Sequence, residues 1–318
     1  MSFIRGRHGA AVLVLLGVVA RSGVAGAYCR TTTEALPANY SPSRGCYTDG
    51  LLLFWKNACV GYSVNATGSR TLAYVDAKRV IDASFTTWMG TTCTETNAPA
   101  GISVSSLGPV ECAEVRYNDK TSNQNLIVFR DDTWPYNDPN STLGLTTVTF
   151  NSENGEIYDA DMELNATGRN LSITEQVPPN GYDLASVVTH EAGHFLGLAH
   201  ATDPSATMFA SYKPGSAALR TLTPDDVAGL CAIYPDTTTR IASKTALQTE
   251  RVVADACDPN PRRGLSSACF VPPTEEASGC ATAPAHGRGY LAGSVLALVA
   301  GVVACRFRRR ARASATEP

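Results

Sequence analysis

The 318-residue chain has no excess of basic residues: 26 lysines and arginines face 29 acidic residues, and the formal net charge is −3. Proteins that bind nucleic acid carry a basic patch that neutralises phosphates, so this composition excludes nucleic acid as a partner. No internal repeat is present, which excludes solenoid and propeller folds. None of the cysteines has the spacing of a zinc ribbon, so structural zinc of that type is excluded as well.

Histidine is also scarce, with five in the whole chain, yet three of them stand within one short run that begins at His190. His190 and His194 are four residues apart, so on a helix their imidazoles lie on the same face. Gly197 tolerates positive φ where that helix must end, and the turn brings His200 to the same point. The spacing predicts one Zn²⁺ held by three neutral imidazoles, with the fourth position open as in catalytic sites.

Glu191 lies beside the first predicted ligand and has the reach to take a proton from a water molecule at the metal. The pattern therefore predicts hydrolysis of peptide bonds in protein or peptide substrates, with Glu191 as general base. Two alternatives remain at this stage. A buried helix with this motif can bind no metal, and a degenerate enzyme can fold around zinc without turning over substrate.

The residues after His200 extend the pattern, since the chain continues Ala-Thr-Asp-Pro-Ser-Ala-Thr-Met-Phe-Ala-Ser-Tyr. HExxHxxGxxH followed by a methionine-bearing turn is the signature of metzincin proteases. The closer resemblance is to the matrixins, the matrix-metalloproteinase branch. It is specific over about residues 140–235 and looser back to about residue 55. The matching residues after the third histidine are Asp203, Pro204, Ala206, Met208 and Tyr212.

The matrixin resemblance implies a role for several further residues. Met208 would form the apolar floor beneath the zinc, and Tyr212 would help to wall the pocket for the residue after the scissile bond. Ala210 stands where some related families have a zinc-binding tyrosine, so a fifth protein ligand is not expected. The segment 222–230 resembles the matrixin C-terminal helix, with its Asp-Asp pair at the positive end of the helix dipole.

The chain also departs from the matrixin pattern. Animal matrixins hold a second, structural zinc with histidines before the active site, but this chain has no histidine between His8 and His190. Asp159 and Asp161 lie in a region rich in oxygen ligands, which fits either structural Ca²⁺ or a solvated acidic loop. Arg44-Gly45-Cys46 has a slight similarity to a latency propeptide, but a disulfide is the favoured interpretation for Cys46.

The fold class implied by these features is α+β, a metzincin-like domain. A mixed twisted sheet would be preceded by a long helix and followed by the zinc-binding helix, the Met-turn and a C-terminal helix. Patterning predicts a core-facing helix over 76–89, and Asp183 as the cap of the zinc helix. It also predicts strands over 59–65, 125–129, 145–150 and 156–164.

The chain ends predict export. Residues 1–27 read as a signal peptide, and 28–57 as a cysteine-containing lead-in to a catalytic domain over 58–235. Residues 236–288, rich in Thr, Pro and Ser, read as a stalk or linker. Eight of the ten cysteines are expected to form disulfides whose connectivity the sequence leaves open, with Cys257 and Cys269 the easiest pair to propose.

A second apolar segment, 289–305, is uncharged and has the minimum length of a membrane span, and a basic tail follows over 306–318. The positive-inside rule would leave the catalytic part outside. Together with Gly279-Cys280, this end resembles the MYXO-CTERM sorting signal of myxobacteria, which implies a processing protease acting near Cys280. A simple anchor, or Cys280 as a disulfide partner, is the alternative.

These observations predict an exported, surface-anchored zinc endopeptidase. The alternatives from other classes are a surface adhesion or binding module on a metzincin scaffold, and an envelope protein in which zinc serves only folding.

Overall fold

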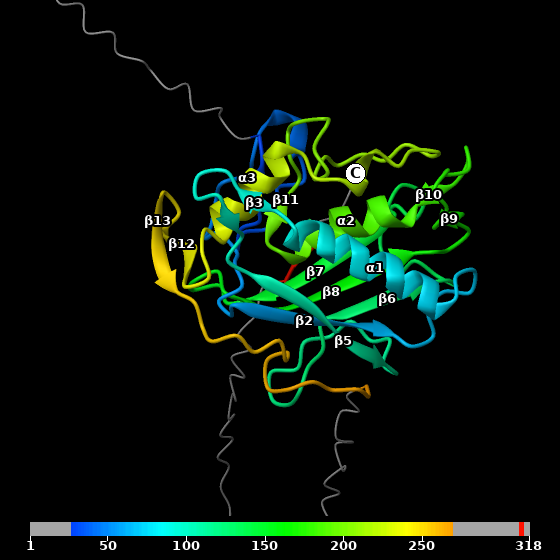
Figure 1. The fold of residues 1–318 in the computed structure, drawn as a ribbon, viewed down its shortest axis with the longest axis horizontal. Helices are drawn as coiled ribbons and strands as arrows, with labels where there is room; N and C mark the ends of the chain where they lie inside the picture. Colours follow the sequence, from blue (N-terminus) through cyan, green and yellow to red (C-terminus); the bar gives the residue numbers. More distant parts are fainter. Residues whose placement is uncertain (1–26, 270–311, 315–318) are drawn as a thin grey trace, which may run out of the picture.

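A mixed β-sheet forms the centre of the protein in the computed structural model, which describes residues 27–269 and the backbone of 312–314 (Figure 1). Its strands are β2 (Cys59–Asn65), β5 (Ser103–Val110), β6 (Leu126–Arg130), β7 (Gly144–Phe150), β8 (Ile157–Asn165) and β14 (Arg312–Ser314). Their order is β14-β7-β8-β6-β2-β5. The pairs β2–β5, β2–β6 and β6–β8 are parallel, whereas β7 runs antiparallel to β8 and to β14.

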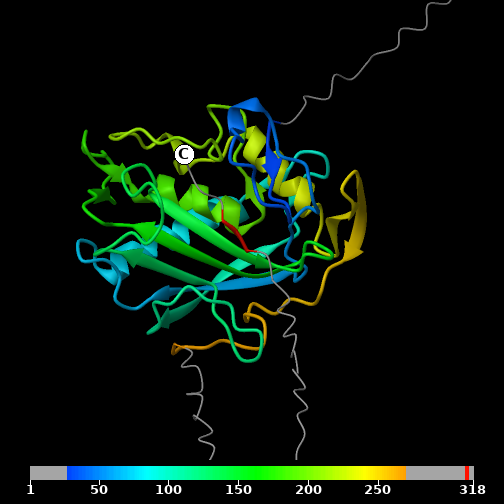
Figure 2. The same cartoon turned by 180° about the vertical axis from the view of Figure 1, so that it is seen from behind.

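Two helices, α1 (Tyr74–Met89) and α2 (Leu184–Phe195), lie side by side on one face of this sheet (Figures 1 and 2). The third helix, α3 (Pro224–Ile233), follows later in the chain. This arrangement confirms the expected α+β class. The remaining short elements are β1 (Cys29–Arg30), η1 (Pro42–Arg44), β3 (Thr92–Cys93), β4 (Ala98–Pro99), β9 (Leu171–Ser172), β10 (Tyr182–Asp183), β11 (Leu198–Ala199), η2 (Ala218–Arg220), β12 (Thr239–Thr245) and β13 (Gln248–Val253).

Aromatic side chains join α1, α2 and the sheet into one core. The ring of Tyr62 on β2 stacks on Phe85 with centroids 4.3 Å apart, and Phe85 meets Phe195 edge-on at 5.2 Å. Trp88 is fully buried, and its indole N–H donates to the carbonyl of Thr189 on α2 over 2.8 Å. Burial of such large rings supplies most of the hydrophobic stabilisation of a core. The apolar face of α1, which the helical periodicity predicted to be buried, therefore packs against α2 and the sheet.

The predicted elements are all present with small differences at their ends. The helix expected over 76–89 begins two residues earlier, at Tyr74. Two strands of the sheet were not predicted from the sequence: β14, which falls in the segment read as a basic tail, and β5. The residues of β5, Ser-Val-Ser-Ser-Leu-Gly-Pro-Val, lack a clear apolar alternation and include the Gly108–Pro109 pair, which is unfavourable in a strand interior. Pairing with β2 along its length overrides this weak local preference.

The N-terminal lead-in is tied to the segment after α2. β1 pairs antiparallel with β11, matching Cys29 with Ala199 and Arg30 with Leu198. Thr31 adds two bonds, since its N–H donates to the Gly197 carbonyl and its hydroxyl to the Leu198 carbonyl, each over 2.9 Å. The lead-in is therefore held directly beside the turn that precedes His200.

Four disulfides are present among the described residues, and their pairing differs from the one proposed from the sequence. Cys257 and Cys269 do not bond to each other. The sequence suggested this pair because the two cysteines flank a Pro-rich loop. In the structure Cys257 bonds to Cys59 at the start of β2, and Cys269 bonds to Cys112 just after β5. The bonds are Cys29–Cys46, Cys59–Cys257, Cys93–Cys231 and Cys112–Cys269. The first of them accounts for Cys46, as the disulfide interpretation predicted.

The described part of the expected stalk, residues 236–269, packs against the domain. The antiparallel pair β12–β13 lies at one side of the central sheet. Residues 254–269 pass along the edge of that sheet on which β5 lies (Figure 1). Arg240 on β12 is fully buried and donates to the carbonyls of Trp55, Gly101 and Asn57 over 2.8–2.9 Å. The sequence could not reveal this role of Arg240, because a single arginine in a segment with the composition of a linker is expected to be solvent-exposed.

Several predicted segments lie outside the described residues: the signal peptide up to residue 26, the apolar segment 289–305, Cys280 and the basic tail apart from the backbone of 312–314. Within the described residues, no helix combines the length and apolarity needed to cross a membrane.

Substitution of Arg240 tests whether residues 236–269 belong to the folded unit. Arg240→Ala leaves several buried carbonyls without a donor, and each unsatisfied group costs about 1–3 kcal/mol, so we expect the free energy of unfolding to fall by about 3 kcal/mol or more. Guanidinium unfolding with intact disulfides measures this. The control is Arg251→Ala, which removes an exposed ion pair to Asp236 worth about 0–1 kcal/mol. Equal losses in the two variants would contradict the anchoring role.

Candidate active site

The helix that carries the first two predicted ligands is fixed at both ends. Asp183 is its N-cap, as predicted, and its carboxylate accepts from the backbone N–H of Ser186 over 2.9 Å. Arg220 holds the same carboxylate over 2.8 Å, which keeps the buried charge paired. At the other end Gly197 adopts φ +94°, a value that strains other residues, and the chain reverses into β11. The reversal brings His200 back beneath α2.

The three histidines converge with their Nε2 atoms. Nε2 of His194 lies 3.1 Å from that of His190 and 3.3 Å from that of His200, and all three side chains are buried. The Nδ1 atoms of His190 and His194 face the carbonyls of Thr207 and Leu198 at 2.6 and 2.9 Å. A carbonyl only accepts, so each Nδ1 donates and the lone pair of a neutral ring is on Nε2.

This geometry fits zinc. Two nitrogen ligands about 2.0–2.1 Å from a tetrahedral zinc ion lie about 3.3 Å apart, close to the spacing of the three Nε2 atoms. Nitrogen lone pairs that face one another in a buried site repel unless a cation lies between them. The carbonyl partners of Nδ1 also match the outer hydrogen bonds that orient histidine ligands in metal sites. The sequence spacing predicted three ligands of one zinc ion, and the three histidines have the geometry and the chemistry to hold it.

Burial also sets the protonation state of the ligands. It lowers the pKa of His190 to about 4 and that of His194 to about 3, and it is the largest cause in both. Burial, together with the two neighbouring rings, places the pKa of His200 well below its usual range. All three imidazoles are therefore neutral near pH 7, the state in which histidine ligates a metal.

Glu191 is buried on the same helix and is held from the sheet. The hydroxyl of Thr146 on β7 donates to Oε2 of Glu191 over 2.7 Å. Gly144 lies against the other oxygen, since a Cβ at this position would be 2.6 Å from Oε1. A glycine and a threonine of β7 thus set the position of the carboxylate. Neither was singled out from the sequence, because no motif links β7 to a helix so far along the chain.

Met208 lies against α2, in line with the floor position that the matrixin resemblance implies. It is 1% exposed, and a Cβ added to Gly193 would be 2.1 Å from its sulfur. The absence of a side chain at Gly193 is what allows the methionine to approach the helix between the two ligands His190 and His194. Its backbone N–H is bound by Asp226 over 3.0 Å.

Asp226 on α3 is a residue of the site whose role the sequence did not reveal. Its carboxylate accepts from the backbone N–H of Thr207 over 2.8 Å and from that of Met208, and it is 1% exposed. Thr207 in turn presents its carbonyl to Nδ1 of His190. Two hydrogen bonds in series therefore connect α3, through Thr207 of the methionine turn, to the first predicted zinc ligand. The sequence had assigned Asp226 only to the helix dipole.

Tyr212 lies beside the first ligand, with its ring centroid 5.6 Å from that of His190. Its hydroxyl donates to the carbonyl of Ser186 on α2 over 3.3 Å. The side chain thus stands on the His190 side of the triad, and its role in a substrate pocket stays a prediction.

Asp159 and Asp161 lie on β8 and are both buried. Asp161 accepts from the backbone N–H of Leu126 over 2.8 Å, which is a structural contact within the sheet. Among the described residues, neither belongs to a cluster of three or more His, Cys, Asp or Glu side chains close enough to share an ion. Calcium binding at this pair stays a prediction without support from the geometry.

Comparison with known proteins agrees with this geometry. The Matrixin family model matches residues 54–235. Metalloendoproteinase 1-MMP of Arabidopsis thaliana is 30% identical over 197 residues, which are 60% of this chain and 47% of that protein. Human matrix metalloproteinase-20 is 35% identical over 103 residues, which are 32% of this chain and 19% of that protein. Human neutrophil collagenase is 32% identical over 129 residues, which are 41% of this chain and 24% of that protein. The chain spans less than half the length of each of these relatives.

The contact of Asp226 with the methionine turn predicts a loss of zinc affinity on substitution. Removing a direct outer partner of a metal ligand weakens binding about 10–100-fold. Asp226 acts on His190 one step further out, through Thr207, so we expect Asp226→Ala to raise the zinc dissociation constant by the lower end of this range, about tenfold. Titration against a competing chelator measures it. Asp225→Ala is the matched control, because Asp225 lies in the same helical turn but accepts from Ala27 N–H over 2.6 Å instead. An equal change in both variants would assign the effect to the helix end.

Proposed function

Because the chain belongs to the matrixin family, we propose that it is a zinc-dependent endopeptidase in which Glu191 is the general base. The observation that carries the proposal is the position of a buried carboxylate on the same helix as two of three converging imidazoles, with Thr146 orienting it from β7. A protein that used zinc only for folding or adhesion has no need of this oriented carboxylate, and no observation favours those alternatives.

The chemistry divides between the metal and the chain. Zinc, when bound by the three imidazoles, polarises the scissile carbonyl and lowers the pKa of a water molecule toward about 7. The Glu191 carboxylate accepts a proton from this water as the oxygen attacks the carbonyl carbon. Glu191 then returns the proton to the amide nitrogen as the C–N bond breaks. The second proton of the water also passes to the released amine, so the products are a carboxylate and an ammonium group. The hydroxyl of Thr146 keeps the carboxylate oriented through both transfers.

The substrate would bind as an extended strand along β7. Residues Arg312–Ser314 support this mode, because they pair antiparallel with Thr147–Thr149 of β7. The edge of β7 thus presents backbone groups in a register that an extended segment accepts, as in β-augmentation. The same strand carries Thr146 and Gly144, so a peptide bound along it passes beside Glu191.

Catalysis would take place outside the cytoplasm, after export by a signal peptide. The four disulfides support this, because such bonds persist in oxidising compartments. Display on the cell surface through the segment 289–305, and processing near Cys280, complete the proposal on the strength of sequence alone. A copy anchored in this way would leave the edge of β7 free of residues 312–314 and open to a substrate.

Replacement of Glu191 tests the proposed function. Glu191→Ala should keep about one zinc per chain while kcat/KM falls about 10²–10⁴-fold, the usual contribution of a general base. The assay is cleavage of a quenched peptide library with and without a chelator, beside metal analysis. An active variant would refute the role of Glu191. A wild-type protein that binds zinc but cleaves no peptide would point to a binding module.

The close approach of Gly144 to Glu191 generates a second prediction. Gly144→Ala places a methyl group 2.6 Å from Oε1 in the present geometry, so the carboxylate must move. A misplacement of about 1 Å can cost about 10²-fold in rate, so we expect kcat to fall by about that factor with zinc content unchanged. Gly90→Ala is the control, because a Cβ there meets no atom nearer than 3.3 Å and lies at the end of α1. Unchanged kcat in Gly144→Ala would argue against the positioning by β7.

A further inference from the structure

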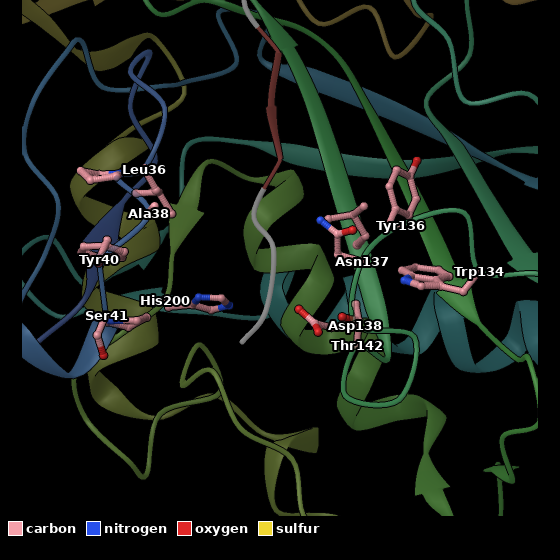
Figure 3. A pocket seen from close by; sticks show the side chains of 13 residues that line it. Leu36, Ala38, Tyr40, Ser41, Trp134, Tyr136, Asn137, Asp138, Thr142 and His200 are labelled. Carbon is pink, nitrogen blue, oxygen red and sulfur yellow. The ribbon is translucent and has the colours of Figure 1, made fainter.

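A cavity of about 390 Å³ opens beside the third zinc ligand, His200. Figure 3 shows Leu36 and Tyr40 on one side of it, Trp134 and Tyr136 on the other, and His200 projecting between them. The first wall is the loop 36–42 of the N-terminal lead-in, and the second is the loop that joins β6 to β7. The volume lies within the range of about 300–1,000 Å³ typical of ligand pockets.

The first wall lies outside residues 54–235, the part of the chain that matches the matrixin model. It is nevertheless held firmly to the metal centre. The β1–β11 pairing places it next to His200, and the Cys29–Cys46 disulfide closes the loop that contains it. Tyr40 fixes its shape, since its N–H donates to the Pro37 carbonyl over 2.9 Å and its hydroxyl to the Gly45 carbonyl over 3.1 Å.

The second wall is held from the sheet. The hydroxyl of Tyr136 binds the buried carboxylate of Glu163 on β8, which also pairs with Arg130. Trp134 packs edge-on against Tyr136, with ring centroids 5.2 Å apart. The indole N–H of Trp134 is buried and has no acceptor among the described residues. Two aromatic rings are thus preorganised on this wall, so they need no further ordering when a ligand binds.

The chemistry of the lining specifies the ligand. Leu36 is 44% exposed and Tyr136 37% exposed, although large apolar side chains on a surface gain by being covered. Among the described residues, no lysine or arginine lines the cavity, and the exposed Asp138 adds a negative charge to it. The cavity therefore suits a bulky apolar or aromatic side chain and disfavours an acidic one.

We propose that this cavity selects a bulky apolar or aromatic side chain of the substrate on the side of the scissile bond opposite to Tyr212. Tyr212 stands beside His190. The cavity is lined by His200, and its lining includes neither Tyr212 nor His190. The two sites therefore flank the triad and receive residues on opposite sides of the bond that is cut. The assignment rests on the proposed endopeptidase function, and it makes the lead-in a determinant of specificity.

Filling the cavity from the first wall tests the assignment. In the full-length protein, Leu36→Trp occupies space that the substrate side chain needs. Cleavage sites in a peptide library are mapped by mass spectrometry, and kcat/KM is then compared for peptides with phenylalanine or glycine at the selected position. We expect the phenylalanine-to-glycine ratio to fall about tenfold or more, as when a hydrophobic pocket loses room. Leu247→Trp, at a residue 95% exposed on the β12–β13 turn, should keep the wild-type ratio.

A second variant tests the charge. Asp138 adopts φ +53°, which asparagine also tolerates, so Asp138→Asn changes the charge without straining the loop. The glutamate-to-glutamine ratio at the same position should rise about threefold or more, since like-charge repulsion is removed.

Each result separates this assignment from the proposed function. A wild-type enzyme that cleaves peptides without preference at this position, or a ratio that Leu36→Trp leaves unchanged, overturns the pocket and leaves the endopeptidase intact. If the wild type and Leu247→Trp bind zinc but cleave no peptide, both proposals fall.

Discussion

Three neutral imidazoles hold their lone pairs toward one point inside the protein, and much of the surrounding structure serves to keep them there. The arrangement is unfavourable without a cation, since the rings are buried and their Nε2 atoms are 3.1–3.3 Å apart. Fixed backbone groups oppose this repulsion. The carbonyls of Thr207 and Leu198 orient two rings, and Asp226 holds the turn that presents Thr207. Each of these groups comes from a different element, so the site forms only when α2, α3 and β11 have all docked.

The core of this arrangement could be predicted because its determinants are local. His190, His194 and Gly197 act through the pitch of one helix and one reversal, and Asp183 caps the same helix. Spacing along the chain is then equivalent to position in space. The strands β2, β6, β7 and β8 and the helix α1 were predicted for the same reason, because each is defined by periodicity within its own segment.

The parts that could not be predicted depend on residues far apart in the sequence. Thr146 reaches Glu191 across 45 positions, and the Cys59–Cys257 bond spans 198. No local pattern encodes such contacts, and the Pro-rich loop suggested a short-range pairing of Cys257 with Cys269 that the fold excludes. The prediction for Arg240 was wrong for another reason. Its burial depends on the carbonyls of Trp55, Asn57 and Gly101, which belong to two segments far from Arg240 in the sequence.

Two of the disulfides also decide how the domain carries mechanical load. Cys59–Cys257 bonds the segment 254–269 to β2, and Cys112–Cys269 bonds it to the loop that follows β5. Tension applied to the chain beyond residue 269 therefore enters through covalent bonds at the sheet. It does not pass through α3, whose Asp226 supports the methionine turn. A pull applied at residue 269 could thus be borne by the sheet while the geometry around the three histidines stays unstrained.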